Sequence, residues 1–282
     1  MRPKQWTKNL LLFAALLFAE RLFEPAAFAA ACLGFVAFCL ASSSVYVVND
    51  LVDAERDRQH PTKRNRPIAS GQVTRPAAGG LAAVLTVAAL GLAFWINAPF
   101  GWITLIYTAF SHFYTFAGKN VVVLDVLLVA FGFVLRAVAG AFAIDVPFSD
   151  WFVLCTLFVA LFIAVSKRRA ELRALGTGSP SRPVLERYTE GALSAFTVTS
   201  MAAAVISYSL YVQDILEERG GEQRALLLTV PFVILAIFRY YLLVDADEAG
   251  EKPEETLISD RPLQLSILGF VLVAVIAFYG RG

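Results

Sequence analysis

Long apolar stretches constrain this sequence more than any other feature. Runs of roughly 18–24 apolar residues alternate with short polar segments along nearly the whole chain, and a helix of that length crosses the core of a lipid bilayer. Lipid offers backbone amides no hydrogen-bond partner, so such segments fold as helices or as the strands of a closed barrel. The runs lack the alternating polar residues of a barrel strand. The pattern therefore predicts an all-α integral membrane protein.

We expect nine transmembrane helices, at about residues 8–20, 25–48, 77–97, 99–117, 121–143, 150–171, 191–213, 224–244 and 263–280. The first run is short, and the cations Arg2, Lys4 and Lys8 before it would also suit a signal peptide. Glu20 and Arg21 follow it in place of a small-residue cleavage site, so we interpret it as an anchor. No soluble domain is expected, and residues 1–282 are interpreted as a single transmembrane domain.

The distribution of Lys and Arg predicts the orientation. With nine spans, 18 of the 24 Lys and Arg residues lie on the side of the amino terminus and 4 on the other side, while Arg136 and Arg239 lie within spans. Lys and Arg mark the cytoplasmic side of short loops, so we expect a multi-pass protein of the cell (inner or plasma) membrane with a cytoplasmic amino terminus. Arg136 is either functional, as intramembrane charges usually are, or a snorkelling or carboxylate-paired cation, with Asp125 as one candidate partner.

Several kinds of chemistry find no support in the sequence. Cys32, Cys39 and Cys155 all lie in apolar spans, which indicates small core residues and neither a disulfide framework nor a zinc site. His60 and His112 are too few and too distant to suggest a metal site or a catalytic triad. No nucleotide-binding glycine loop or nucleophile elbow is present, and no nucleic-acid partner is expected.

The segment that indicates chemistry lies at the cytoplasmic end of the second predicted span. Continuing that helix at 100° per residue places Asn49, Asp50, Asp53 and Asp57 on one face, with Glu55 roughly opposite. Carboxylates stacked in this way repel one another and destabilise a bare helix. Mg²⁺ would offset the repulsion, because it prefers hard oxygen ligands and is commonly held by one or two carboxylates together with substrate phosphates.

A basic loop follows at once, with Lys63, Arg64 and Arg66 between prolines and Gly71. An acidic metal-binding helix beside a basic loop is suited to a metal-chelated phosphate ligand. Two plainer interpretations stay open for the isolated segments. The aspartates could form a solvated helix end paired with arginines, and the loop could serve topology or contact lipid headgroups.

These residues carry a family resemblance. The spacing Asn49-Asp50-x-x-Asp53-x-x-x-Asp57, followed by Lys63-x-x-Arg66-Pro67-x-x-x-Gly71, resembles the first signature of the UbiA-type prenyltransferase superfamily. The resemblance covers essentially the whole chain. It implies a bundle of nine transmembrane helices around a central cavity open to the cytoplasmic face, with a diphosphate bound through Mg²⁺ at its mouth.

One departure from the superfamily pattern points to a subgroup. Aromatic prenyltransferases of the superfamily carry a second aspartate-rich motif after the sixth helix, where this chain has Lys167, Arg168 and Glu171. This cationic site with one carboxylate is similar to that of the polyprenyl-phosphate phosphoribosyltransferases. Further similar stretches are Arg2-Pro3-x-Gln5-Trp6-x-Lys8-Asn9, Val134-Leu135-Arg136-Ala137, Arg239-Tyr240 and Asp260-Arg261-x-x-Gln264. A plain surface ion pair between Lys167 and Glu171 is the alternative interpretation.

The resemblance implies Mg²⁺-dependent transfer of 5-phosphoribose from phosphoribosyl pyrophosphate to a membrane polyprenyl phosphate of the decaprenyl type, for cell-wall arabinan precursors. The implied catalytic and metal residues are Asp50, Asp53 and Asp57. The implied substrate-binding residues are Lys8, Asn49, Lys63, Arg64, Arg66, Lys167, Arg168, Glu171, Glu186, Tyr188 and Arg239. Among these, Lys8 would hold the acceptor phosphate. A homo-oligomer is left open.

Two other functions are alternatives to phosphoribosyl transfer. Prenylation of an aromatic or quinone-precursor acceptor needs the second aspartate cluster, which is absent from this sequence. A transporter would show internal repeats and helices interrupted at matching positions, and the sequence has no convincing repeat. Its strongest polar cluster also lies at the membrane edge, which favours an enzyme.

Overall fold

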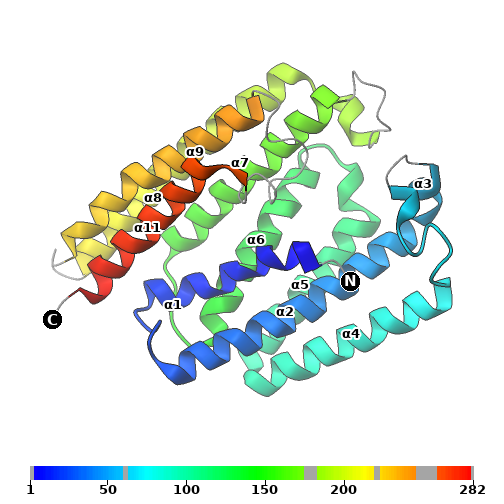
Figure 1. Cartoon of the computed structure of the whole chain (residues 1–282), viewed down its shortest axis with the longest axis horizontal. Helices are drawn as coiled ribbons and strands as arrows, with labels where there is room; N and C mark the ends of the chain where they lie inside the picture. Colours follow the sequence, from blue (N-terminus) through cyan, green and yellow to red (C-terminus); the bar gives the residue numbers. More distant parts are fainter. Residues whose placement is uncertain (1–2, 60–62, 175–182, 219–222, 246–258, 281–282) are drawn as a thin grey trace. The chain divides into compact units, whose positions relative to one another are not determined.

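The computed structural model describes residues 3–59, 63–174, 183–218, 223–245 and 259–280, and within these ranges the regular structure is helical, without strands. By their contacts the residues group into two units. Unit 1 comprises Met1–Leu16, Leu22–Leu128 and Leu135–Pro147, and unit 2 comprises Leu17–Arg21, Val129–Val134 and Phe148–Gly282. Figure 1 shows the helices of the chain.

The helices agree closely with the apolar runs. The long ones are α2 (Pro25–Val52), α4 (Arg75–Ile96), α5 (Ala98–Phe116), α6 (Leu124–Ala143), α7 (Asp150–Ala174), α8 (Glu190–Glu218), α9 (Val230–Asp245) and α11 (Arg261–Tyr279). The short ones are α1 (Ala14–Phe18), α3 (Ala54–Gln59) and the 3-10 helices η1 (Pro3–Phe13), η2 (Lys63–Asn65), η3 (Gly118–Asn120), η5 (Pro183–Arg187) and η6 (Arg224–Thr229).

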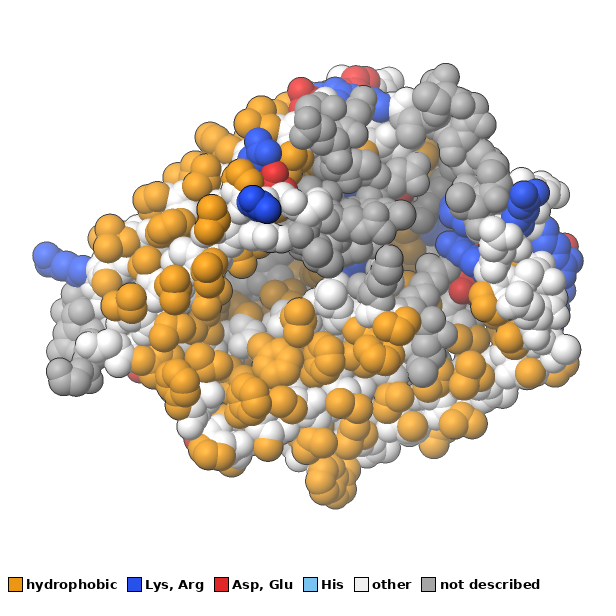
Figure 2. Space-filling view, viewed as in Figure 1, with side chains coloured by type: hydrophobic (Ala, Val, Ile, Leu, Met, Phe, Trp, Pro, Cys, Tyr) orange, Lys and Arg blue, Asp and Glu red, His pale blue; other side chains and the backbone are white. Residues whose placement is uncertain are grey.

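Seven helices of the described part are long and apolar enough to cross a membrane: α2, α4, α6, α7, α8, α11 and the segment Arg224–Asp245. Their outer faces are strongly apolar; on α4, for example, Val84, Val87 and Trp95 are each at least 66% exposed. Figure 2 shows such hydrophobic side chains over much of the visible surface. Seven such helices with outward apolar faces suit a lipid environment, so the protein is a multi-pass membrane protein.

The first predicted span differs from expectation, because η1 is a 3-10 helix of 11 residues. Side chains three apart eclipse in a 3-10 helix, and the burial follows that period. Asn9 and Leu12 are fully buried while Thr7 and Leu10 are exposed. The backbone of this segment packs closely against α6. A Cβ added at Gly140 of α6 would lie 2.2 Å from the Leu12 carbonyl oxygen.

In unit 1, α2 packs against α4, α5 and η1. The serines of α2 make several of these contacts polar: Ser44 Oγ donates to the Ala82 carbonyl of α4 at 2.9 Å. Asn97 ends α4 and caps α5, and its amide donates to the Phe142 carbonyl at the end of α6 at 2.8 Å. These bonds fix the helices that carry the acidic segment.

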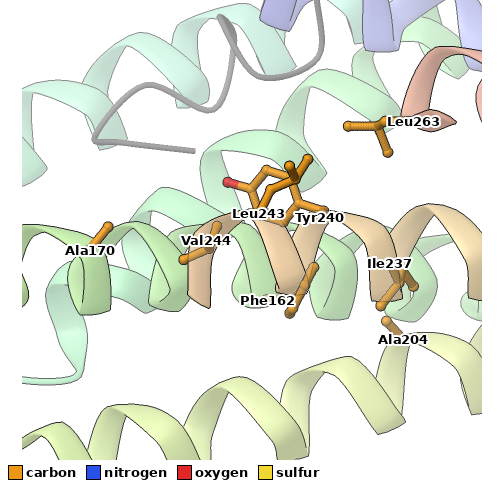
Figure 3. Packing of buried hydrophobic residues seen from close by; sticks show 8 residues of the cluster. All are labelled: Phe162, Ala170, Ala204, Ile237, Tyr240, Leu243, Val244 and Leu263. Atoms are coloured by element: carbon orange, nitrogen blue, oxygen red, sulfur yellow. The ribbon is translucent and has the colours of Figure 1, made fainter. Parts of the chain in front are cut away.

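In unit 2, α7 packs along α8, and α9 packs along α11. Side chains of all four helices form one apolar core, seen in Figure 3: Phe162, Ala170, Ala204, Ile237, Tyr240, Leu243, Val244 and Leu263. Asp260 caps α11 by accepting the Leu263 amide at 2.8 Å. This packing fixes the register of α7, which carries the second candidate segment.

Candidate functional site

The acidic segment follows the end of α2 into α3. Asp53 interrupts the helix with φ −89° and ψ 2°. The backbone bonds nevertheless continue, because the Asp53 amide donates to Asn49 at 3.0 Å and the Asp57 amide donates to Asp53 at 2.8 Å. The turn therefore stays nearly helical across the break, as the spacing of the aspartates requires.

Arg66 joins two of the three aspartates. Its Nη1 lies 3.2 Å from Asp50 Oδ1 and 2.5 Å from Asp57 Oδ2. The Asp57 side chain is only 6% exposed and that of Arg66 is 25% exposed. Charge-assisted bonds of this kind are strong. The prediction that Asp50 and Asp57 share a face is thus confirmed, and Arg66 of the basic loop lies beside them.

The loop that presents Arg66 is anchored to unit 1 by apolar contacts. Ile68 is buried in a cluster with Val47 of α2 and Ala78 of α4. The Val73 amide donates to the Pro67 carbonyl at 3.0 Å, which closes the turn, and Gly71 adopts φ +81°, a conformation that suits glycine. The basic loop is therefore packed against unit 1, and its Arg66 side chain contacts Asp50 of α2. Residues 60–62 of this loop lie outside the described residues.

Lys119 meets the third aspartate. It lies in η3, between α5 and α6, and its Nζ is 2.7 Å from Asp53 Oδ1, with only 11% of the Lys119 side chain exposed. In the sequence, Lys119 is one of the 18 Lys and Arg residues on the predicted cytoplasmic side, and it belongs to no motif. The two residues are 66 positions apart, so no local pattern reveals the contact.

The acidic segment has the type of ligand atoms that a hard divalent cation binds. Three carboxylates and the Asn49 carboxamide, which is half-buried, supply the oxygen ligands that Mg²⁺ prefers. Within the described ranges, no three His, Cys, Asp or Glu side chains are grouped closely enough to hold a metal ion as they stand. The described contacts of the three aspartates are instead with Arg66 and Lys119.

Four more residues singled out in the sequence lie in α3, in η2 and in η1. Glu55, expected on the opposite side, is 66% exposed there and pairs with Arg58 and Arg75. In the basic loop, Lys63 is half-buried and Arg64 is exposed. Lys8 is half-buried on η1.

In unit 2, the predicted cationic segment lies at the end of α7. Arg168 pairs with Glu171 at 2.5 Å, and their side chains are only 5% and 12% exposed. Lys167 is half-buried beside them. Arg168, three residues before Glu171, is thus a partner of that carboxylate.

A larger ionic network surrounds this segment. Arg169 Nε donates to Glu190 at the start of α8 at 2.8 Å, and its Nη1 lies 2.9 Å from Asp245 at the end of α9. Arg173 contacts the same two carboxylates at 2.9 and 3.2 Å. No local sequence pattern predicts this network, because its members come from three helices. The ion pairs join those helix ends and so fix the position of Arg168.

The other predicted residues of unit 2 lie in or near η5 and in α9. Glu186 is exposed and Tyr188 is buried, both in or just after η5. Arg239 of α9 pairs with Asp260 through Nη2 at 2.7 Å. This hydrogen-bonded guanidinium holds the pKa of the Asp260 carboxyl below its ordinary value.

Arg136 forms a buried polar hub in unit 1. It is 7% exposed; its Nε donates to Asn9 Oδ1 at 2.9 Å and its Nη2 donates to the Tyr107 hydroxyl at 2.7 Å. Asn9 in turn donates to Ser42 Oγ at 3.3 Å. Asp125 lies eleven residues away on the continuous α6, about 16 Å along its axis at the usual helical rise, which is too far for the direct pair considered from the sequence.

Comparison with known proteins identifies the family of this chain. The pattern of the UbiA prenyltransferase family matches residues 10–259. The chain belongs to this family. A decaprenyl-phosphate phosphoribosyltransferase of Mycolicibacterium smegmatis is 40% identical over 99% of this chain and 91% of its own length. A decaprenyl-phosphate phosphoribosyltransferase of Corynebacterium glutamicum is 38% identical over 99% of this chain and 85% of its own length.

A solved UbiA homolog from Archaeoglobus fulgidus, bound to DMAPP and Mg²⁺, shares the UbiA fold. Its TM-score is 0.72 at 19% sequence identity, covering 98% of this chain and 96% of that one. The match of the family pattern and the 38–40% identity to the two relatives confirm the resemblance to the UbiA superfamily stated from the motifs.

Proposed function

We propose that this UbiA-family protein transfers 5-phosphoribose from phosphoribosyl pyrophosphate to a membrane polyprenyl phosphate of the decaprenyl type. The observation that carries the proposal is the 38–40% identity, over nearly the whole chain, to two bacterial decaprenyl-phosphate phosphoribosyltransferases. The lipid product would supply cell-wall arabinan synthesis.

The reaction needs charge stabilisation more than a strong base. The bond between ribose C1 and the pyrophosphate oxygen breaks, and its electron pair leaves with pyrophosphate. A phosphate oxygen of the lipid supplies the electron pair of the new bond to C1, so no proton has to be removed. Catalysis then depends on stabilising the leaving group and on orienting the two substrates.

The residues of the acidic segment and the basic loop suit the leaving group. We assign Asp50, Asp53 and Asp57, with Asn49, to a Mg²⁺ that neutralises charge on the diphosphate when it is bound. Arg66 lies within bonding distance of these carboxylates and would donate to phosphate oxygens. Lys63, Arg64 and the newly found Lys119 would donate to the same group.

The remaining candidates are assigned by their chemistry. Lys167 and Arg168 would bind a further phosphate of the substrates, and Glu171, paired with Arg168, would orient that cation. Glu186, Tyr188 and Arg239 are assigned to donor contacts, and Lys8 to the acceptor phosphate.

Nine membrane spans remain our proposal for the topology. η1 and α1 together have 16 residues. At about 2.0 Å per residue in a 3-10 helix and about 1.5 Å in an α-helix, they extend for about 30 Å, the thickness of the hydrocarbon core. The 19-residue α5, made less apolar by residues such as His112, would be the other added span.

Four further features stay predictions: the cytoplasmic amino terminus, the location in the cell membrane, the cavity open to the cytoplasm, and the single domain over 1–282. They rest on the charge distribution and the family resemblance. A homo-oligomer stays open as well.

A direct assay tests the function. Purified protein is incubated with Mg²⁺, polyprenyl phosphate and labelled phosphoribosyl pyrophosphate, and label should enter the lipid phase; a chelator should abolish this. Asp53→Asn should lose transfer while remaining folded. Glu55→Gln, an exposed carboxylate on the other side of the same turn, is the matched control and should retain it.

The second candidate, prenyl transfer to an aromatic acceptor, is tested in parallel with prenyl diphosphate and 4-hydroxybenzoate. It is the general activity that the family name suggests, but the Arg168–Glu171 pair occupies the place where aromatic prenyltransferases carry a second aspartate cluster. Label transfer in this reaction, and none from phosphoribosyl pyrophosphate, would refute the leading proposal.

A further inference from the structure

All three aspartates of the acidic segment contact cations of the same chain. Arg66 bridges Asp50 and Asp57, and Lys119 contacts Asp53. None of the five side chains is more than 25% exposed. The cations therefore lie where a metal ligated by these carboxylates would repel them.

Low exposure makes that competition strong. Charges a few ångström apart interact several times more strongly at a partly buried site than in water. A bare divalent cation that enters must either lie beside Arg66 and Lys119 or displace them from their carboxylates. Displacement without a new anion leaves two cations without a partner, which is costly in a poorly solvated site.

A metal that arrives on a diphosphate meets no such barrier. The diphosphate carries more negative charge than one Mg²⁺ neutralises, and its oxygens accept hydrogen bonds from guanidinium and ammonium groups. Arg66 and Lys119 can then turn from the carboxylates to phosphate oxygens while the metal takes the carboxylates.

We propose that the site binds its donor as a preformed Mg²⁺–diphosphate complex, and that Arg66 and Lys119 exclude the bare metal by occupying the carboxylates until the diphosphate arrives. This inference rests on the proposed function. It adds the chemical species that is bound and gives the two cations a second role as displaceable counterions.

The structure allows Arg66 to exchange partners without moving its loop. Its backbone is held in a turn, because its amide donates to Lys63 at 2.9 Å and its carbonyl accepts from Ser70 at 2.8 Å. Ile68 anchors the following residues in the apolar cluster. Only the side chain has to rotate, and it is the most exposed of the five.

The test measures metal binding, with Mn²⁺ as the probe for Mg²⁺. Equilibrium dialysis of the purified full chain at fixed free Mn²⁺ is carried out with and without inorganic pyrophosphate. We expect pyrophosphate to tighten Mn²⁺ binding by about tenfold or more, on the scale by which a neighbouring charge shifts a protonation equilibrium. Arg66→Gln should bind Mn²⁺ alone more tightly than the native protein and gain less from pyrophosphate.

Two variants separate this effect from general damage. Lys119→Met removes the other counterion and should also tighten binding of Mn²⁺ alone. Arg75→Gln removes a cation from the same end of unit 1 that is 61% exposed and pairs with Glu55 instead, and it should change neither measurement.

The inference is overturned if the native protein binds Mn²⁺ equally well with and without pyrophosphate, or if Arg66→Gln and Lys119→Met both weaken binding of Mn²⁺ alone. The first of these results together with normal phosphoribosyl transfer would reject the inference and keep the proposed function. Absence of both metal binding and transfer would reject the proposed function as well.

Discussion

Removal of Asn9 tests whether the buried hub stabilises unit 1. Asn9 is fully buried and accepts a hydrogen bond from Arg136 while donating to Ser42. A hydrogen bond to a charged group contributes about 1.5–3 kcal/mol, whereas neutral bonds between membrane helices average about 0.6 kcal/mol. We therefore expect Asn9→Ala to lower the free energy of unfolding by about 2–3 kcal/mol, with most of the loss at Arg136.

A double-mutant cycle separates this contact from the loss of packing. Arg136→Met removes the charge and keeps much of the side-chain volume, and it is combined with Asn9→Ala. Because the second change then removes no further contact between the pair, the double variant should be about 1.5–2 kcal/mol more stable than the sum of the single effects predicts. Reversible unfolding in bilayer-mimicking micelles measures the free energies.

The same variants have an expected effect on activity. Lys8 lies next to Asn9 on η1, so displacement of η1 should raise KM for the polyprenyl phosphate more than KM for the donor. Additive free energies in the cycle would refute the hydrogen-bonded hub, and equal changes in both KM values would refute the link to the acceptor.

Two further predictions concern other parts of the chain. Gly140→Ala should strongly destabilise the protein in a melting experiment, because the new Cβ would lie 2.2 Å from a backbone oxygen of Leu12. Gly79→Ala, where nothing lies within 4 Å of the new Cβ, is the control and should be neutral or stabilising. Equal effects of the two changes would contradict the close packing of η1. Arg239→Met should lower the melting temperature by a constant amount from pH 7 to pH 5. Arg239 depresses the pKa of Asp260, so the pair is fully stabilising above the unfolded pKa of about 3.9 and is lost as the pH falls through the lower folded value. If the difference in melting temperature between the native protein and Arg239→Met already disappears near pH 6, the stabilising role of the Arg239–Asp260 pair is contradicted.

Local sequence determined most of the helices. A run of apolar residues in lipid has to satisfy its own backbone, so α2, α4 and α11 begin and end within a few residues of the runs that predicted them. The same reasoning located the acidic segment, because helical spacing alone places Asp50 and Asp57 on one face. Asp53 interrupts the helix without separating them, since the backbone hydrogen bonds continue through it.

The tertiary structure decided the contacts between segments. Lys119 reaches Asp53 across 66 residues, and Arg169 and Arg173 join the ends of three helices. η1 is a 3-10 helix that packs closely against Gly140, although its sequence reads as an ordinary apolar run. Periodicity determines which face a residue occupies, but the partner of that face depends on how distant helices pack. The sequence therefore predicted the carboxylates of the candidate site, and only the folded chain showed which cations hold them.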